Sequence, residues 1–358
     1  MAGAIFGASE GSDRDAPASA DERSLGRLSL AQRVGQTLML SFHGTTPPRY
    51  VLDILREGRA AGVVLFRDNA TSRRQLRRLT GRLQRAARDS ALIAADQEGG
   101  AIRILEWADP ADGQASQADA REAGAAARAT AGDLTTAGVN VNLAPVADVS
   151  APRGSAVGGR TYPGDAKAVA ASTSAAVRGL DAGRVAATAK HFPGFGPAQA
   201  NTDDEPVTIR ARRERLIQRD LAPFRAAIAA GTPFVMASHA AYPAFDRRRI
   251  ASQSPAVLQR LLRGRLGFRG VVITDSLEAE AVLRRAPVDR AAVRSLRAGA
   301  DLILMTGAGS FAPVRDRVLG RARGDPSFRD RVDDAARRVL GAKRRLGLPP
   351  VRSQRVGR

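Results

Sequence analysis

The residues best suited to chemistry in this chain are polar groups, most of which directly follow apolar segments. They comprise two acids, two cations and two imidazoles: Asp96, Asp275, Arg160, Lys190, His191 and His239. Carboxylates accept hydrogen bonds from hydroxyl groups, while Arg and Lys donate them, so a ring of such groups suits a polyhydroxylated ligand. The Lys190-His191 pair is the most informative, because a cation at the end of a buried segment is unfavourable unless a polar partner meets it.

Other common kinds of catalytic site are not indicated by the sequence. None of the three His residues lies near a Ser in a Gly-x-Ser-x-Gly turn, and neither common type of Gly-rich phosphate loop is present. The chain has no Cys, and no His-x-x-x-His spacing supports a zinc site. We therefore expect neither a metal nor an organic cofactor.

To bring the polar groups together, the chain needs parallel strands that end at one edge. Eight apolar runs occur, and most of them end in a charged or polar group: residues 34–42, 62–66, 91–95, 139–146, 185–189, 234–238, 270–274 and 300–305. Near-continuous apolar runs suit parallel strands that are covered on both faces.

Segments with helical spacing of apolar residues lie between these runs. They are residues 71–88, 221–228, a segment that begins near Pro287, and an amphipathic segment over 332–346. Strand–helix alternation repeated about eight times predicts an α/β fold with a single (β/α)8 TIM-type barrel. Such barrels carry functional groups at the carboxyl ends of their strands, so the polar groups are expected to meet at one mouth.

The two ends of the chain differ from its body. Residues 1–26 are rich in Ala, Ser, Asp and Gly, so we expect a disordered leader, then the barrel over 27–348 and a loose basic tail over 349–358. No apolar segment is long enough for a signal peptide or a transmembrane span. This favours a cytoplasmic location and leaves export open. We expect a monomer.

The formal net charge is +20, and nearly all of the positive charge is Arg. A nucleic-acid surface would produce such a charge. However, the arginines are spread over many segments, and only three Tyr and one Trp are available as stacking platforms. We favour a compositional preference for Arg over Lys and predict no specific nucleic-acid partner, although weak attraction to acidic cell-wall polymers is expected.

Seven motifs occur in the order in which one known family carries them. They are Leu30-Ala-Gln-Arg-Val-Gly-Gln, Asp96-Gln-Glu-Gly-Gly, Asn142-Leu-Ala-Pro-Val-Ala-Asp148, Gly159-Arg-Thr-Tyr162, Lys190-His-Phe-Pro-Gly194, Met236-Ala-Ser-His239 and Gly267-Phe-Arg-Gly-Val-Val-Ile-Thr-Asp275. With these motifs the chain resembles the family 3 glycoside hydrolases, in the single-domain branch that contains the bacterial β-N-acetylhexosaminidases. The resemblance covers roughly residues 28 to 347.

The resemblance implies a role for each matched residue. Asp275 matches the family's nucleophile, which would form a covalent glycosyl-enzyme that water opens with retention. Asp96 matches an acceptor of sugar hydroxyls. Arg160, Lys190 and His191 match donors that hold the sugar in the first subsite.

Two further residues lie in matched motifs. His239 ends one of them and is expected to contact the substrate. Glu98 lies in the Asp96 motif, but we do not assign it to the sugar. Because Gly99-Gly100 follows it, we expect Glu98 only to support the turn.

The loop after the Lys190 motif departs from the family pattern. Relatives carry Asp-Ser-His there, and that His is their general acid/base, whereas this chain has Asn201-Thr-Asp203. Three explanations stay open. Asp203, or its neighbour Asp204 or Glu205, acts as the general acid/base with a raised pKa. Alternatively the loop is not catalytic, and the barrel binds sugar or acts only on good leaving groups. In the third explanation the loop is a plain turn, and the acid comes from elsewhere.

A second departure concerns the Asp96 motif. Relatives usually have Arg where this chain has Ala101 and Ile104. Arg103 would replace them only if the backbone shifts, because adjacent residues of an extended chain point to opposite faces. The identity of the sugar is therefore less certain than the family implies.

Together these observations imply a retaining exo-β-glycosidase that hydrolyses terminal β-linked N-acetylhexosamine or a related β-glycoside. Asp275 would be its nucleophile, and Asp203 is the candidate acid/base. A peptidoglycan fragment is one expected substrate, which would give the protein a role in cell-wall turnover. The alternative is a catalytically impaired sugar-binding barrel that lacks a general acid/base.

Overall fold

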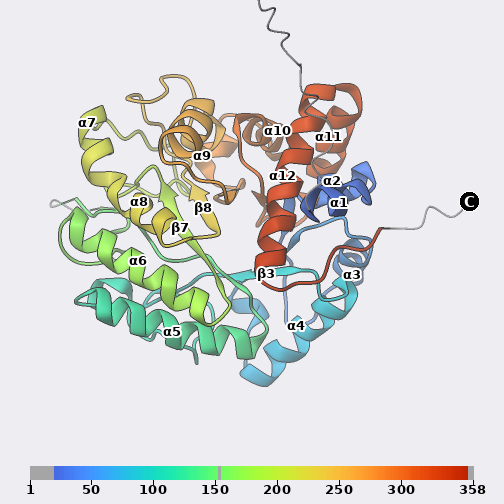
Figure 1. The fold of residues 1–358 in the computed structure, drawn as a ribbon, viewed down its shortest axis with the longest axis horizontal. Coiled ribbons are helices and arrows are strands. Elements are labelled where there is room, and N and C mark those ends of the chain that lie inside the picture. Colours follow the sequence, from blue (N-terminus) through green and yellow to red (C-terminus); the bar gives the residue numbers. More distant parts are fainter. Residues whose placement is uncertain (1–19, 152–154, 354–358) are drawn as a thin grey trace, which may run out of the picture.

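Eight parallel strands form the centre of the fold in the computed structural model, which describes residues 20–151 and 155–353. They are β1 (Leu38–Leu40), β2 (Gly62–Leu65), β3 (Leu92–Ala95), β6 (Val141–Asn142), β7 (Ala186–Phe192), β8 (Phe234–Ala237), β9 (Val271–Thr274) and β10 (Ile303–Leu304). β10 pairs with β1, and a bridge between Ile273 and Leu302 joins β9 to the segment that enters β10. The sheet thus closes almost completely, and the predicted (β/α)8 barrel is confirmed (Figure 1).

Seven of the eight predicted apolar runs contain one of these strands, and the run 185–189 overlaps β7, which continues to Phe192. Successive side chains pack on opposite sides of the sheet: Met39 lies in the core inside the barrel, and Leu40 lies in the layer between strands and helices. Because both faces are covered, most strand residues are apolar rather than alternating with polar residues. β1 is shorter than its run, since Val34 and Gly35 end the helix α2 (Leu30–Gly35).

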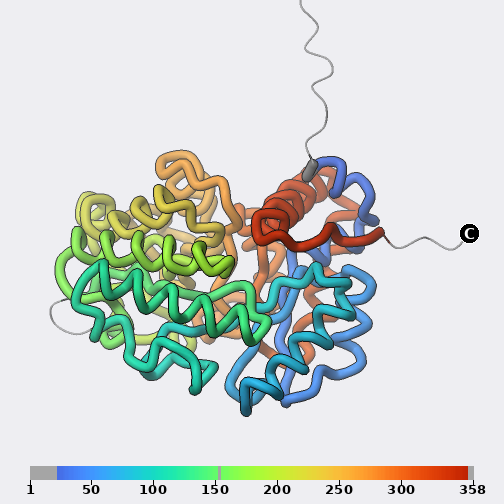
Figure 2. The backbone as a smooth tube through the Cα atoms, turned by 60° about the horizontal axis from the view of Figure 1, so that its bottom comes forward, coloured from blue at the N-terminus to red at the C-terminus, as the bar shows by residue number. Residues whose placement is uncertain are grey.

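Helices form the outer layer around the strands. Besides α2 they include α3 (Arg49–Arg56), α4 (Arg73–Ala87), α5 (Ala120–Ala137), α6 (Ala166–Ala182), α8 (Ala222–Ala229), a π-helical segment (Ala256–Arg265), α10 (Val288–Ala298), α11 (Phe311–Gly324) and α12 (Pro326–Arg345). The four predicted helical segments are confirmed as α4, α8, α10 and α12. Figures 1 and 2 show α5 and α6 side by side along one flank of the barrel.

The N-terminal boundary differs from the prediction. Helix α1 (Ala20–Gly26) lies within the segment that we expected to be disordered. Its Leu25 is buried in a small apolar cluster with Leu28, Ala336 and Leu340. This contact with α12 stabilises a short helix that the local sequence alone does not indicate. The prediction is therefore wrong for residues 20–26, and residues 1–19 lie outside the described part of the chain.

The start of the basic tail also packs on the barrel. Val351 contacts the apolar cluster of Leu25, and the carbonyl of Arg352 accepts a hydrogen bond from Gln32 Nε2 at 2.9 Å. Val351 and Arg352 thus contact the body, which the expected loose tail did not include. Residues 354–358 lie outside the described part.

A buried acid accounts for part of the Arg content. Asp301 is fully buried and pairs with three arginines: Arg263, Arg331 and Arg338. Its carboxylate also accepts the backbone N–H of Val272 at 2.8 Å. A buried charge without partners is strongly unfavourable, so this cluster ties α12 and the π-helical segment to the β9–β10 edge of the barrel.

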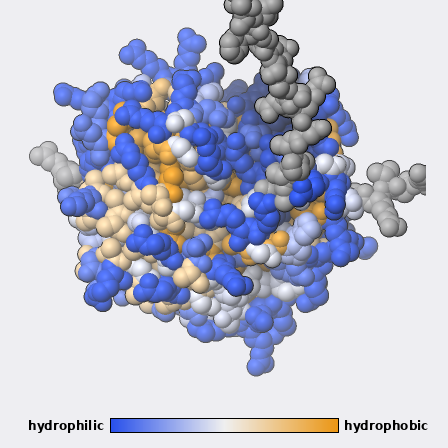
Figure 3. All heavy atoms as spheres, viewed as in Figure 1, coloured by the Kyte–Doolittle hydropathy of each residue, from blue (hydrophilic) through white to orange (hydrophobic). Residues whose placement is uncertain are grey.

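Hydrophilic side chains cover most of the visible surface, with apolar patches between them (Figure 3). Among the helices of residues 20–151 and 155–353, none combines the length and the apolar character needed to cross a bilayer.

Burial of Lys343 on α12 makes stability depend on pH. Its ammonium is buried and donates to Gln36 Oε1 at 2.7 Å, and burial lowers the pKa of Lys343 from 10.5 to about 7. Between these values the unfolded chain binds more protons than the folded chain, so the free energy of unfolding rises with pH across this window. We expect Lys343→Met to remove this part of the pH dependence in urea unfolding at pH 7, 8 and 9. Lys167→Met, on the exposed face of α6, is the matched control. Equal slopes for wild type and Lys343→Met would contradict the assignment.

Candidate active site

A cavity of roughly 480 Å³ opens at the carboxyl ends of the strands, where the polar groups were expected. Asp96 directly follows β3, Asp275 directly follows β9, and Lys190 lies near the end of β7. Six of the seven predicted site residues line this cavity: Asp96, Arg160, Lys190, His191, Asp203 and Asp275. The mouth of the barrel therefore brings together groups that are up to 179 positions apart in the sequence (275 − 96).

Lys190 and His191 both reach the cavity although they are adjacent. Neighbouring residues of a regular strand point to opposite faces. The pairing of β7 with β8 changes register between Ala189 and Phe192, in the stretch that contains both residues. Such irregularities re-aim side chains, so this one lets a single strand contribute two donors.

Glu98 is the anion that organises these donors. Its carboxylate is buried, pairs with Lys190 Nζ at 2.6 Å, and accepts two hydrogen bonds from Arg160 at 2.7 and 2.8 Å. Lys190 Nζ also donates to Asp96 Oδ1 at 2.5 Å. Burial would raise the pKa of Glu98, but Lys190 and Arg160 lower it to about 2. Glu98 thus stays ionised and holds both cations, a role beyond the expected support of a turn.

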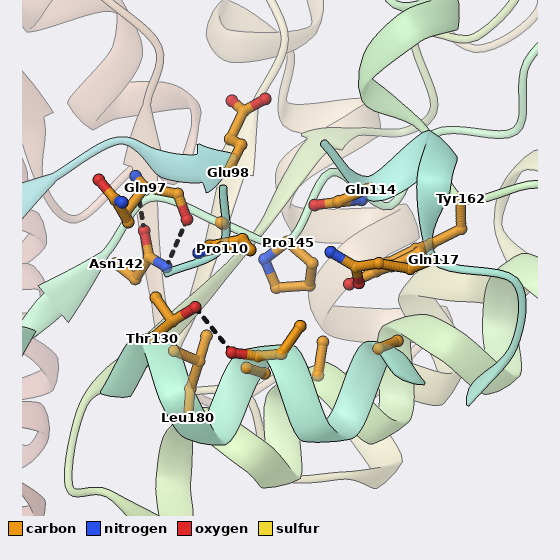
Figure 4. Close-up of a pocket in the computed structure, with 15 residues that line it drawn as sticks. Gln97, Glu98, Pro110, Gln114, Gln117, Thr130, Asn142, Pro145, Tyr162 and Leu180 are labelled. Carbon is orange, nitrogen blue, oxygen red and sulfur yellow. Dashed lines mark hydrogen bonds between the residues drawn. The ribbon is translucent and has the colours of Figure 1, made fainter. Parts of the chain in front are cut away.

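The backbone beside Glu98 is fixed from behind. Gln97 N–H donates to Asn142 Oδ1, and Asn142 Nδ2 donates to the Gln97 carbonyl, both at 3.0 Å. Figure 4 shows this pair beside a small internal cavity, with the Glu98 carboxylate directed away from that cavity. The Gln97–Asn142 pair beside this cavity therefore supports the orientation of Glu98.

Asp148 orients His191 in the same way. It is fully buried, and its Oδ2 accepts His191 Nδ1 at 2.8 Å. Its Oδ1 accepts the backbone N–H groups of His191 at 3.2 Å and Phe195 at 2.6 Å. Because Nδ1 is engaged by Asp148, Nε2 is the ring nitrogen that His191 offers to a ligand.

The environment of Asp275 favours its ionised form. Burial raises the pKa of Asp275, but His191, the Ser276 backbone N–H and Lys190 are among the groups that outweigh burial and lower it. The Ser276 N–H donates to Asp275 Oδ1 at 2.8 Å. An ionised carboxylate at the base of the cavity is able to act as a nucleophile at neutral pH.

The loop that departs from the family pattern closes one side of the cavity. Asn201 Nδ2 donates to Asp203 Oδ2 at 3.2 Å. The loop is docked by the backbone N–H groups of Glu280 and Ala281, which donate to the carbonyls of Asp203 and Thr202 at 3.2 and 3.1 Å. These N–H groups belong to the start of α9 (Glu280–Leu283), shortly after Asp275.

Asp203 has the opposite electrostatic setting from Asp275. Burial raises the pKa of Asp203, and the nearby Asp275 carboxylate raises it further. Asp204 and Glu205 do not line the cavity. Among the three acids of the loop, Asp203 is thus the one with the position and the raised pKa that a general acid needs.

His239 does not lie where we expected it. Its side chain is fully buried outside the cavity lining, with Nδ1 2.7 Å from Ser252 Oγ and Nε2 2.9 Å from the Ser276 carbonyl. Burial lowers the pKa of His239, so the ring is neutral and donates from Nε2. The prediction of a substrate contact is therefore wrong in this arrangement, and His239 instead positions the backbone beside Asp275.

Arg103 does not replace the arginines that relatives carry. It is directed away from the cavity and donates to the Glu106 carbonyl at 2.5 Å. Ile102 and Ile104, on either side of it, line the cavity instead. The opposite facing expected for adjacent residues is thus observed, and this wall of the cavity is apolar.

The contacts that Glu98 and Asp148 make with Lys190, Arg160 and His191 were not predicted from the sequence. Both acids lie inside motifs that match the family. An acid that is buried among apolar residues requires a polar partner, so their positions in these motifs were the available signal. Within residues 20–151 and 155–353, no group of three or more His, Asp and Glu side chains is arranged to hold a metal ion.

Comparison with known proteins identifies the family of the chain. Residues 29–342 match the glycosyl hydrolase family 3 N terminal domain. A beta-hexosaminidase of Stenotrophomonas maltophilia is 36% identical over 279 residues, which cover 75% of this chain and 82% of that protein. The crystal structure of a beta-N-acetylhexosaminidase from Beutenbergia cavernae matches with a TM-score of 0.81 at 34% identity, covering 88% of this chain and 98% of that one.

A family 3 beta-N-acetylglucosaminidase from a Paenibacillus species has a similar fold, with a TM-score of 0.86 at 35% identity. The match covers 89% of this chain and 63% of that longer one. The family expected from the motifs is therefore confirmed: the chain belongs to glycosyl hydrolase family 3 and is a glycoside hydrolase.

Proposed function

We propose that the chain is a retaining exo-β-glycosidase that removes terminal β-linked N-acetylhexosamine or a related sugar. The observation that carries this proposal is the pairing, in one cavity, of Asp275 with a lowered pKa and Asp203 with a raised pKa. Glycoside hydrolysis uses two carboxyl groups, and environments that shift their pKa values in opposite directions suit one as the acid and the other as the nucleophile.

The proposed reaction has two steps. In the first, an Asp275 oxygen bonds to the anomeric carbon, the bond to the leaving oxygen breaks, and Asp203 gives its proton to that oxygen. In the second, Asp203 takes a proton from water, the water oxygen bonds to the anomeric carbon, and the bond to Asp275 breaks. Two inversions leave the sugar with its original configuration.

The cations of the cavity hold the sugar in this proposal. The Lys190 ammonium is shared between Asp96 and Glu98, and Asp96 keeps its second oxygen for a sugar hydroxyl. The Arg160 guanidinium donates to further hydroxyls, and His191 Nε2 forms a hydrogen bond with another. N-acetylhexosamine is proposed because the named relatives are hexosaminidases. A peptidoglycan fragment is the proposed natural substrate, and the protein would then act in cell-wall turnover.

The nucleophile is tested with a panel of nitrophenyl β-glycosides that carry N-acetylglucosamine, N-acetylgalactosamine or glucose. We expect wild type to release nitrophenol from at least one of them, and Asp275→Asn to lower kcat/KM about a thousandfold or more. If wild type is as inactive as Asp275→Asn on every sugar while still binding sugar, the barrel is a sugar-binding protein and not an enzyme.

The acid/base is tested with Asp203→Asn. Because protonation matters most for poor leaving groups, we expect a large loss on a disaccharide and a small loss on the dinitrophenyl glycoside. Azide should restore turnover of the dinitrophenyl glycoside by the Asp203→Asn variant, and the product should be the β-glycosyl azide. In wild type the rate should fall as rising pH deprotonates Asp203, at a pH above the usual range for Asp, and this limb should disappear in the variant.

Asp204→Asn is the matched control for this experiment, since Asp204 is the exposed neighbour of Asp203. Equal losses in both variants, or no dependence on the leaving group in Asp203→Asn, would show that the acid comes from another residue.

The positioning role of Glu98 is tested with Glu98→Gln. An amide does not neutralise Lys190 and Arg160, so we expect sugar binding to weaken and KM to rise about tenfold or more. The shape of the pH profile should persist, because Asp203 and Asp275 are unchanged. Glu106→Gln, on an exposed acid, is the control. An unchanged KM in a folded Glu98→Gln variant would refute this role.

A further inference from the structure

A second cavity, of roughly 480 Å³, lies between the loop that follows β8 and helix α10. Five arginines line it: Arg248, Arg249, Arg285, Arg294 and Arg297. The rest of the lining is uncharged and comes from Ile250, Gln253, Pro255 and Ala298. We call this cavity the arginine groove. No acid of the described chain lines it, and it shares no residue with the active-site cavity.

The charge of the arginine groove is only partly neutralised. Arg297 pairs with Asp325 at 2.8 Å, and Arg249 lies 3.9 Å from Asp246. Asp325 is itself shared with Arg321. The other three groove arginines form no ion pair within residues 20–151 and 155–353: Arg248, Arg285 and Arg294. Like charges in one cavity repel each other, so an anion in the groove would be stabilised.

A compositional preference for Arg does not account for this arrangement. Such a preference predicts arginines that are dispersed or matched with acids. That is what occurs at the buried Asp301 and at Arg73 on α4, which lies 3.3 Å from Asp133. Five arginines around one cavity without a lining acid form a different pattern.

We propose that the arginine groove binds a compact oligophosphate, an anion with two or more linked phosphate groups. Guanidinium groups present planar pairs of N–H donors that match phosphate oxygens. A single carboxylate would neutralise only one of the five charges, whereas linked phosphates neutralise several at once. No aromatic side chain lines the groove, so stacking on a nucleobase is not part of the recognition.

Inorganic pyrophosphate is the probe for this proposal, and titration calorimetry of the full chain at constant ionic strength is the measurement. We expect saturable binding with one site per chain in wild type. Arg248→Gln/Arg285→Gln should weaken it by about tenfold for each charge-assisted contact that is lost. Arg78→Gln/Arg82→Gln removes the same charge from the exposed face of α4 and should bind like wild type.

Thermal melting separates loss of the site from loss of the fold. Pyrophosphate should raise the Tm of wild type more than that of the groove variant. Without pyrophosphate and at low salt, the variant should melt at the same or a higher temperature, because repulsion is relieved. If the double variant does not fold, Arg285→Gln alone serves the same comparison.

Two outcomes would overturn the proposal. The first is equal weakening in both double variants, or binding that does not saturate, since either would indicate diffuse attraction to a cationic surface. The second is that a DNA duplex binds more tightly than pyrophosphate, and that both double variants lose this binding equally at moderate salt. The experiment does not depend on glycosidase activity, so it stands or falls independently of the proposed reaction.

Discussion

The cavity depends on one buried carboxylate, Glu98, placed beneath two cations. Lys190 and Arg160 come from distant segments, and neither would be held at the end of a parallel barrel without an anion to meet it. Glu98 supplies that anion, and the Gln97–Asn142 amide pair fixes the backbone beside it. As a result, Asp96 engages Lys190 through one oxygen and keeps the other for a ligand.

The charges around the cavity shift the pKa values of two similar side chains in opposite directions. Asp275 lies close enough to His191 and Lys190 for its charged form to be favoured despite burial. At Asp203, burial and the nearby Asp275 carboxylate disfavour a second negative charge and raise the pKa. His191, which Asp148 orients, and Lys190, which Glu98 holds, are among the groups that lower the pKa of Asp275. The positioning residues thus contribute to the difference in pKa on which the proposed assignment of nucleophile and proton donor rests.

Much of the fold was predictable, because a parallel strand covered on both faces leaves a continuous apolar run in the sequence. The strand-end rule also identified Asp96, Lys190 and Asp275. It misassigned His239, since the end of a strand does not reveal whether a side chain points into the mouth or sideways to Ser252. The role of Glu98 was not visible either, because its partner Arg160 is 62 residues away and no local pattern records such a pairing. Helix α1 was missed for the same reason, since its partner is the last helix.

The charge pattern of the cavity also bears on which nucleophile opens the glycosyl-enzyme. Asp203 and Asp275 both line the cavity, and Glu278 adds a third carboxylate beside them. A phosphate ion that attacked the anomeric carbon would have to approach past Asp203, where a neutral imidazole would tolerate it and a carboxylate repels it. Water carries no charge and meets no such barrier. The high positive charge of the chain does not reverse this, because the unpaired arginines of the groove lie outside the active-site cavity. In the proposed reaction, a carboxylate at position 203 in place of an imidazole therefore favours hydrolysis over phosphorolysis, even in a protein whose net charge is +20.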